Sequence, residues 1–168
     1  MTEYVLGIDP GFKGTGWAVV RKLDGRKPVV EASGVIRPER SLRRKGLAVP
    51  YLLLALNIQY KLSLEVHRFQ PTKIVIEMPA LWGRNAISLA SAQRGDLFQL
   101  AMLVGVFSGD LHQCCGVVPV LRTAAEWKGQ LSKEAIVKRI QRALGVSTAL
   151  RDHEADAVGM CLNELDLL

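Results

Sequence analysis

Cysteine, aromatic residues and long apolar runs are all scarce in this sequence of 168 residues. The cysteines are Cys114, Cys115 and Cys161, an odd set without the Cys-X-X-Cys spacing of a zinc site, so neither a disulfide framework nor a zinc site is indicated. The longest apolar stretch, residues 97–109, contains Gln99 and is shorter than the ~20 residues that span a bilayer. No signal peptide precedes the first predicted strand. These absences predict a soluble, cytoplasmic protein with reduced thiols and no membrane partner.

The composition is that of an ordinary globular protein, with 49% hydrophobic and 23% charged residues. Lys and Arg number 22 against 16 Asp and Glu, which gives a formal net charge of +6. A basic surface favours a polyanionic partner such as nucleic acid. With no linker or repeat, residues 1–168 are predicted to form one domain.

Hydrophobic periodicity predicts an α/β fold in which three strands precede alternating helices and strands. Short turns make the first three strands antiparallel, and helical crossovers make the later two parallel. The prediction is therefore a five-stranded mixed sheet flanked by helices. The expected strands are residues 5–9, 15–21, 29–36, 73–77 and 117–121, and the expected helices are residues 51–69, 86–113, 132–144 and 152–167.

Acidic side chains stand where two of these strands end. Asp9 and Glu77 end the first and fourth strands, and parallel neighbours would place both at one edge of the sheet, where ligands bind in α/β folds. Asp152, His153 and Asp156 share one face of the last helix. With no Lys or Arg assigned to this group, a divalent cation would have to neutralise it. Taken singly, Asp9 before Pro10-Gly11 could be a turn former, and Asp156 a solvated helix residue.

Four elements in order along residues 5–165 resemble the RuvC family of Holliday-junction resolvases, in the ribonuclease H-like superfamily. They are Gly7-Ile8-Asp9-Pro10-Gly11 with Thr15-Gly16-Trp17, Phe69-Gln70-Pro71 before Ile74-Val75-Ile76-Glu77, Asn85 with Gln93-Arg94-Gly95, and His153-Glu154-Ala155-Asp156-Ala157. The resemblance implies a ribonuclease H-like fold and metal-dependent hydrolysis of DNA phosphodiesters to 5′-phosphate and 3′-hydroxyl ends.

By the same resemblance, Asp9, Glu77, His153 and Asp156 would hold two Mg²⁺ ions about 4 Å apart, with Mn²⁺ able to substitute. One ion would activate a water and the other would stabilise the leaving 3′-oxygen. Many members carry Asp where His153 stands. An imidazole ligand binds transition-metal ions better than it binds Mg²⁺. Asp152, one residue earlier, stays open as the third ligand.

The resemblance also implies DNA contacts and partners. Lys133, counted with the catalytic residues, and Lys128 would contact phosphates near the scissile bond, Trp82 would stack at the branch point, and Arg84 would bind a phosphate. For each of the two lysines the alternative is a solvated surface charge, and for Trp82 a place in the core. The implied partners are branched DNA (four-way junctions and also forks) and a second copy in a homodimer, within a bacterial or phage-infected cell.

Three other functions compete with junction resolution. An endonuclease of the same fold could prefer forks, three-way junctions or flaps. A non-catalytic branched-DNA-binding module would have little reason to keep Asp9, Glu77 and Asp156 together. A member of the actin and sugar-kinase superfamily would need a second phosphate hairpin, which this sequence lacks. The sequence favours the nuclease.

Overall fold

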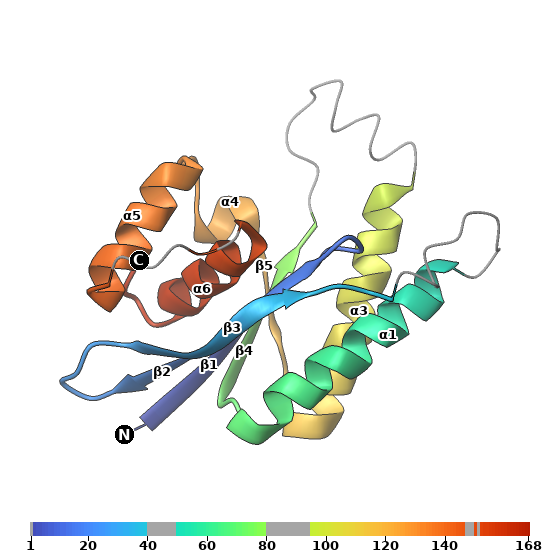
Figure 1. The fold of residues 1–168 in the computed structure, drawn as a ribbon, viewed down its shortest axis with the longest axis horizontal. Helices are drawn as coiled ribbons and strands as arrows, with labels where there is room; N and C mark the ends of the chain where they lie inside the picture. The colour runs from blue at the N-terminus through green and yellow to red at the C-terminus, as the bar shows by residue number, and fades with distance from the viewer. Residues whose placement is uncertain (1, 40–49, 80–94, 147–149, 151) are drawn as a thin grey trace.

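The computed structural model of the protein describes residues 2–39, 50–79, 95–146, 150 and 152–168. Five strands and their flanking helices follow one another in the predicted order (Figure 1). The strands are β1 (Thr2–Asp9), β2 (Thr15–Leu23), β3 (Val29–Ile36), β4 (Lys73–Met78) and β5 (Val120–Thr123). The helices are α1 (Pro50–Val66), the 3₁₀ turn η2 (His67–Phe69), α3 (Asp96–Cys115), α4 (Ala124–Trp127), α5 (Lys133–Leu144) and α6 (Asp152–Glu164).

The five strands form one mixed sheet in the order β3-β2-β1-β4-β5. The β1–β2 and β2–β3 pairs are antiparallel, whereas β4 lies parallel to both β1 and β5. This arrangement confirms the predicted mixed sheet. It also makes β1 and β4 hydrogen-bonded neighbours, with Ile8 opposite Ile76, so their carboxyl ends lie at the same edge.

Helices cover both faces of the sheet, with α1 and α3 on one side and α4, α5 and α6 on the other (Figure 1). Alternation along each strand divides the apolar side chains between two cores. Leu6, Ile8 and Ile76 pack with α1 and α3, whereas Val5 and Val75 pack with α5 and α6. Each strand is therefore apolar on both faces, as a sheet between two helical layers requires.

The structure corrects several predicted boundaries. The fifth strand runs from Val120 to Thr123 instead of residues 117–121, because α3 continues to Cys115 and Pro119 has no N–H to donate to a ladder. The short helix α4 was not predicted. The last helix ends at Glu164 rather than residue 167. Of the predicted helix over residues 86–113, the part before Gly95 lies outside the described residues.

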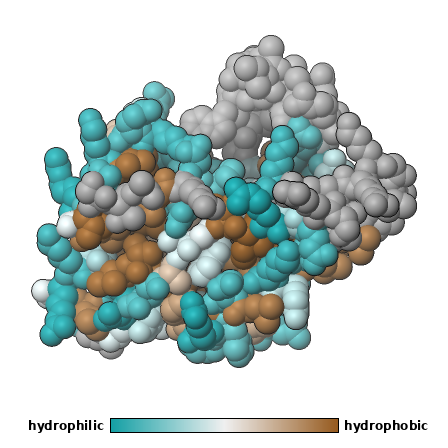
Figure 2. Space-filling view, viewed as in Figure 1, coloured by the Kyte–Doolittle hydropathy of each residue, from teal (hydrophilic) through white to brown (hydrophobic). Residues whose placement is uncertain are grey.

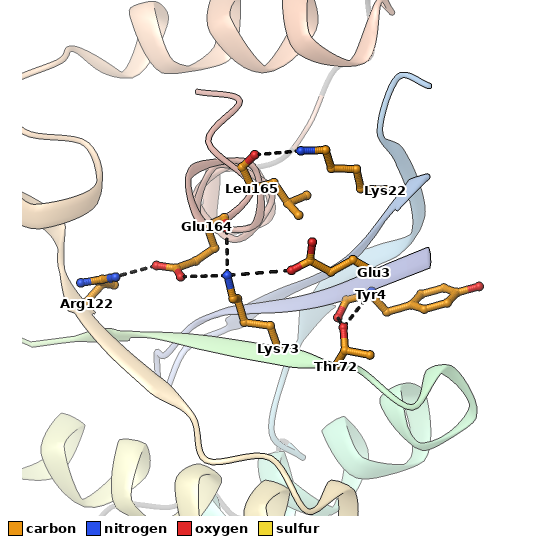
Figure 3. Close-up of polar contacts among 8 residues, drawn as sticks. All are labelled: Glu3, Tyr4, Lys22, Thr72, Lys73, Arg122, Glu164 and Leu165. Atoms are coloured by element: carbon orange, nitrogen blue, oxygen red, sulfur yellow. Dashed lines mark hydrogen bonds and ion pairs between the residues drawn. The ribbon is translucent and has the colours of Figure 1, made fainter. Parts of the chain in front are cut away.

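A polar cluster fastens the carboxyl end of α6 to residues of β2, β4 and β5 (Figure 3). The largely buried carboxylate of Glu164 accepts from Arg122 Nε at 2.9 Å, and Lys73 Nζ donates to the Glu164 carbonyl at 3.0 Å. Lys22 Nζ donates to the Leu165 carbonyl at 3.2 Å. Cations at a helix carboxyl end also interact favourably with its dipole. These contacts fix one end of α6 and so help to place the other.

A largely apolar pocket lies between α5 and the β2–β3 hairpin, on a side where Figure 2 shows hydrophobic residues at the surface. Val29, Val30, Leu144 and Val146 line this pocket of about 420 Å³. Among the described helices, none is both long and apolar enough to cross a membrane.

Candidate active site

Strand alternation directs Asp9 and Glu77 toward the same helical layer. Asp9 lies two residues beyond Gly7 and four beyond Val5, and Glu77 lies two beyond Val75, so both carboxylates face α6. Asp9 is 8% exposed and Glu77 is partly buried. The predicted convergence of the two acids at one sheet edge is therefore confirmed for the backbone positions.

Two glycines allow α6 to approach this edge closely. A Cβ at Gly7 would lie 2.3 Å from the Ala157 carbonyl oxygen, and a Cβ at Gly16 would lie 2.0 Å from that of His153. Gly16 pairs directly with Asp9 across the β1–β2 ladder. Any side chain at either position would lift the helix away. Because Gly7 and Gly16 have no side chain, the amino end of α6 can lie directly over Asp9.

Each of the three clustered carboxylates has its own partner. His153 Nδ1 lies 2.6 Å from Asp9 Oδ2, joining α6 to β1. The Trp127 indole Nε1–H donates to Glu77 Oε2 at 2.9 Å. Lys128 Nζ lies 3.4 Å from Asp156 Oδ2. Lys128, which the resemblance implies as a phosphate contact near the scissile bond, therefore lies beside one of these acids and offsets part of the negative charge.

Burial and mutual repulsion shape the ionisation of the cluster. Burial raises the pKa of Glu77, and the nearby Asp9 carboxylate raises it further, against a lowering by the Trp127 hydrogen bond. Burial likewise raises the pKa of Asp156, partly offset by Lys128. The hydrogen bond to Asp9 is the main cause of a raised pKa at His153. Nearby negative charges without enough cationic partners are what a bound cation would relieve.

The donor chemistry at this edge fits a hard divalent cation. A small hollow of about 60 Å³ lies between Asp9 and Glu77 and is also lined by Pro10, Pro79 and Leu100. Such a space admits an ion with some of its water but no nucleotide. Across the residues that the structure describes, no three His, Cys, Asp or Glu side chains are placed to hold one ion together. Asp156 is paired with Lys128, so an ion bound at this carboxylate would have to displace the Lys128 ammonium.

Asp152 does not join the acids despite its place on the same predicted helix face. Its side chain is 81% exposed and pairs with Lys133 Nζ at 2.9 Å, which lowers the pKa of Asp152. Lys133 is the first residue of α5, after the Ser132 cap, as the sequence predicted. Of the two candidates for a third ligand, the structure brings His153 to Asp9 and turns Asp152 toward α5.

The predicted DNA contacts are only partly described. Lys128 and Lys133 both lie beside the acidic cluster, each paired with an aspartate of α6. Trp82 and Arg84 fall in residues 80–94, outside the described part of the chain, so their predicted roles stay predictions.

Trp127 is the residue at this site that sequence reasoning missed. Its indole is buried against Glu77, and none of the patterns in the sequence analysis assigned it to the site. The available signal was the capping pattern Thr123…Glu126, which starts a helix just before it. Gly7 and Gly16 were noted as motif residues, and their spacing from Asp9 on the strand pair would have predicted a close approach.

Comparison with known proteins assigns nearly the full length of the chain to one family. The family model described as crossover junction endodeoxyribonuclease RuvC matches residues 5–163. The enzyme of that name from Psychromonas ingrahamii is 30% identical over 162 residues, covering 94% of this chain and 84% of that protein. Its counterpart from Gluconacetobacter diazotrophicus is 30% identical over 158 residues, covering 94% and 87%.

Solved structures agree on the fold. Thermus thermophilus RuvC in complex with a Holliday junction substrate superposes with a TM-score of 0.72 at 21% identity, covering 98% of this chain and 93% of that one. The yeast mitochondrial Holliday junction resolvase Ydc2 gives 0.58 at 18% identity, covering 98% and 80%. Together with the match over nearly the full length, these likenesses show that the chain belongs to the RuvC family of crossover junction endodeoxyribonucleases, with its ribonuclease H-like fold.

Proposed function

We propose that this protein resolves four-way DNA junctions by hydrolysing phosphodiesters to 5′-phosphate and 3′-hydroxyl ends. The observation that carries the proposal is the meeting of Asp9, Glu77 and Asp156 at the carboxyl edge of the sheet, with His153 hydrogen-bonded to Asp9. A dead binding module would have no reason to retain buried acids that repel one another. The names of the relatives support the four-way junction as substrate.

In this proposal Asp9, Glu77 and Asp156 hold two Mg²⁺ ions, for which Mn²⁺ can substitute, and His153 completes the set. Bound metal lowers the pKa of a water and offsets charge on the phosphate. The side chains of the site orient one another and neutralise charge. Asp9 holds the His153 ring through Nδ1, which fixes the direction of the other ring nitrogen.

DNA binding is assigned to cations around the acids. We propose that Lys128 and Lys133 leave Asp156 and Asp152 to contact phosphates near the scissile bond, a step that substrate charge would drive. Trp82 is proposed to stack on a base at the branch point and Arg84 to bind a phosphate. Lys133 is counted with the catalytic residues because it would touch the reacting strand.

A homodimer would present two such sites to the two opposed strands of a junction, and its place of action would be the cytoplasm, where bacterial DNA lies. Light scattering of the purified protein should give the mass of two chains, twice 18.5 kDa. A measured mass that corresponds to one chain, both for the free protein and for its complex with junction DNA, would contradict this assignment.

The test of the function is cleavage of matched duplex, fork, three-way and four-way DNA with Mg²⁺, with Mn²⁺ and with a chelator. We expect cutting of the four-way junction in metal only, and 5′-phosphates that a ligase can seal. Faster cutting of forks or three-way junctions would reassign the substrate. Binding without any cutting would reduce the protein to a branched-DNA-binding module.

A further inference from the structure

The indole of Trp127 touches the acidic cluster on two sides. Its Nε1–H donates to Glu77 Oε2 at 2.9 Å, and the Lys128 ammonium lies 4.8 Å from the centre of its ring. The same ammonium lies 3.4 Å from Asp156 Oδ2. One buried side chain therefore links a strand acid to a helix acid, through a hydrogen bond on one side and a cation–π contact on the other.

Local structure explains why the indole stands there. β5 pairs with β4 through Glu77 and Arg122 and then through Met78 and Thr123, so the chain leaves the sheet one residue beyond Glu77. A capping box then starts α4 at once: the Glu126 carboxylate accepts from the Thr123 N–H at 2.6 Å, and the Thr123 hydroxyl accepts from the Glu126 N–H. Trp127, at the end of this single turn, is carried back over the acid, and only 4% of it is exposed.

Helix α6 leaves room for the ring. A Cβ at Gly159 would lie 2.8 Å from Trp127 Cζ3, and Ile136 of α5 is nearby. Gly159 lies three residues after Asp156, so the notch for the indole is on the helix that carries the acid. The ring is thus held by α4, α5 and α6 together and has little freedom to turn away from Glu77.

We propose that Trp127 is a positioning residue for metal binding: its N–H holds one oxygen of Glu77 and leaves the other directed at the ion. This inference rests on the proposed function, because the ion is the one assigned to that site. A carboxylate free to rotate would lose freedom on binding metal, whereas one already held by a donor does not. The ring face also holds Lys128 near Asp156, which neutralises that acid until an ion arrives.

The test is Mn²⁺ titration by calorimetry without DNA, comparing the wild type with Trp127→Phe. Phenylalanine keeps an apolar ring for Gly159 and Lys128 but has no N–H for Glu77. Trp17→Phe is the matched control, since Trp17 is similarly buried but lies in the other core, on the opposite face of the sheet from α6. We expect a 10- to 100-fold weaker Mn²⁺ affinity for Trp127→Phe and no change for Trp17→Phe.

A double-mutant cycle separates positioning from general loss of structure. In a Glu77→Gln background, Trp127→Phe should weaken Mn²⁺ binding no further, because the carboxylate it positions is gone. Equal losses in both backgrounds, or wild-type affinity in Trp127→Phe, would overturn the inference. So would a wild-type protein that binds no Mn²⁺. Trp127-dependent Mn²⁺ binding by a protein that cuts no DNA would instead contradict only the proposed function.

A second measurement serves if Trp127→Phe does not fold. The indole N–H signals of the folded wild type and of Glu77→Gln are compared by NMR, before and after Mg²⁺. One indole signal, identified as Trp127 by the closeness of its ring to Gly159, should move on the substitution and on metal addition. An indole signal of Trp127 that responds to neither would reject the proposal.

Discussion

Charge and burial conflict at two residues of the site, Glu77 and Asp156. Both pKa values are raised, chiefly by burial, so the folded state holds protons at a pH where the unfolded chain has released them. The metal-free protein should therefore lose stability as the pH rises from the ordinary carboxyl range through these raised values. Bound metal should restore it.

Glu77→Gln tests this conflict directly. The amide can still accept from the Trp127 N–H, but it carries no charge and is a poor ligand for Mg²⁺. The cleavage rate should fall by roughly 10²-fold or more, which exceeds the usual loss when a residue that only hydrogen-bonds to a metal ligand is replaced. Junction binding should persist, and the melting temperature in chelator should rise by roughly 2–4 °C, the effect of ~1 kcal/mol at this size. Glu65→Gln, on the exposed side of α1, is the control; near-normal cutting by Glu77→Gln would reject the metal assignment.

His153 makes the site sensitive to pH. The hydrogen bond to Asp9 raises its pKa above the ordinary 6.5, so the protonated ring persists to higher pH and competes with metal. At limiting Mg²⁺, cleavage should increase as the pH rises through a midpoint above 6.5, and more metal should lower that midpoint. Without metal, the contribution of the His153–Asp9 pair to the free energy of unfolding changes with pH in the opposite direction. It is fully present below about pH 6.5 and is lost as the pH rises through the raised pKa of His153.

His153 variants identify the ligand. His153→Ala should remove most activity and the pH midpoint, Asp152→Ala should cost little, and His153→Asp should keep activity and favour Mg²⁺ over Mn²⁺. The structure supports this order, since Asp152 is 81% exposed and pairs with Lys133. Loss of cleavage in Asp152→Ala with mild effects in His153→Ala would transfer the role to Asp152.

At the scale of elements, α6 is the part on which the site depends. Its amino end carries His153 and Asp156, and glycines of β1 and β2 let it lie close to the sheet. Its carboxyl end is fixed by Arg122, Lys73 and Lys22 (Figure 3). A helix fixed at both ends can hold its acids at a constant distance from Asp9 without any metal.

Gly16→Ala should separate this helix from the sheet. The new Cβ would lie 2.0 Å from the His153 carbonyl oxygen, a backbone atom that cannot move alone. We expect a loss of roughly 1–3 kcal/mol in the free energy of unfolding and a large loss of cleavage. Gly109→Ala in α3 is the matched control, because a Cβ there meets nothing within 4 Å and should stabilise the helix by roughly 0.5–1 kcal/mol. Wild-type stability and cutting in Gly16→Ala would show that α6 tolerates displacement.

At the scale of the whole molecule, a net charge of +6 surrounds a small acidic site. The excess positive charge attracts DNA from a distance, while the acids repel phosphate unless cations intervene. The two lysines beside the acids, Lys128 and Lys133, lie where these opposing fields meet. Their removal should therefore affect the reaction more than the affinity.

Lys133→Ala measures that difference. One phosphate contact among many contributes little to affinity, so junction binding should weaken only modestly, with a salt slope smaller by about one. The cleavage rate should fall about tenfold, equivalent to ~1.4 kcal/mol. Lys138→Ala, on the exposed side of α5, is the control and should lower affinity without lowering the rate. An unchanged rate in Lys133→Ala would leave that lysine as a solvated surface charge.

The sequence alone determined the order of the strands and the longer helices, the mixed sheet and the acids at the ends of β1 and β4. These follow from local signals: apolar periodicity, turn residues, the Ser132 cap and the Gly145 that ends α5 with positive φ. The sequence was less reliable where a boundary depends on pairing, as at β5, whose start is set by the register with β4 and by Pro119.

Only the tertiary structure decided which partner each acid takes. Asp152 and Asp156 are four residues apart on one helix, yet one turns to Lys133 and the other to Lys128. Trp127 reaches Glu77 across 50 residues of sequence, through a helix too short for any periodicity to predict. Side-chain partners over such separations depend on how layers pack, and packing depends on volumes that meet only in the folded chain.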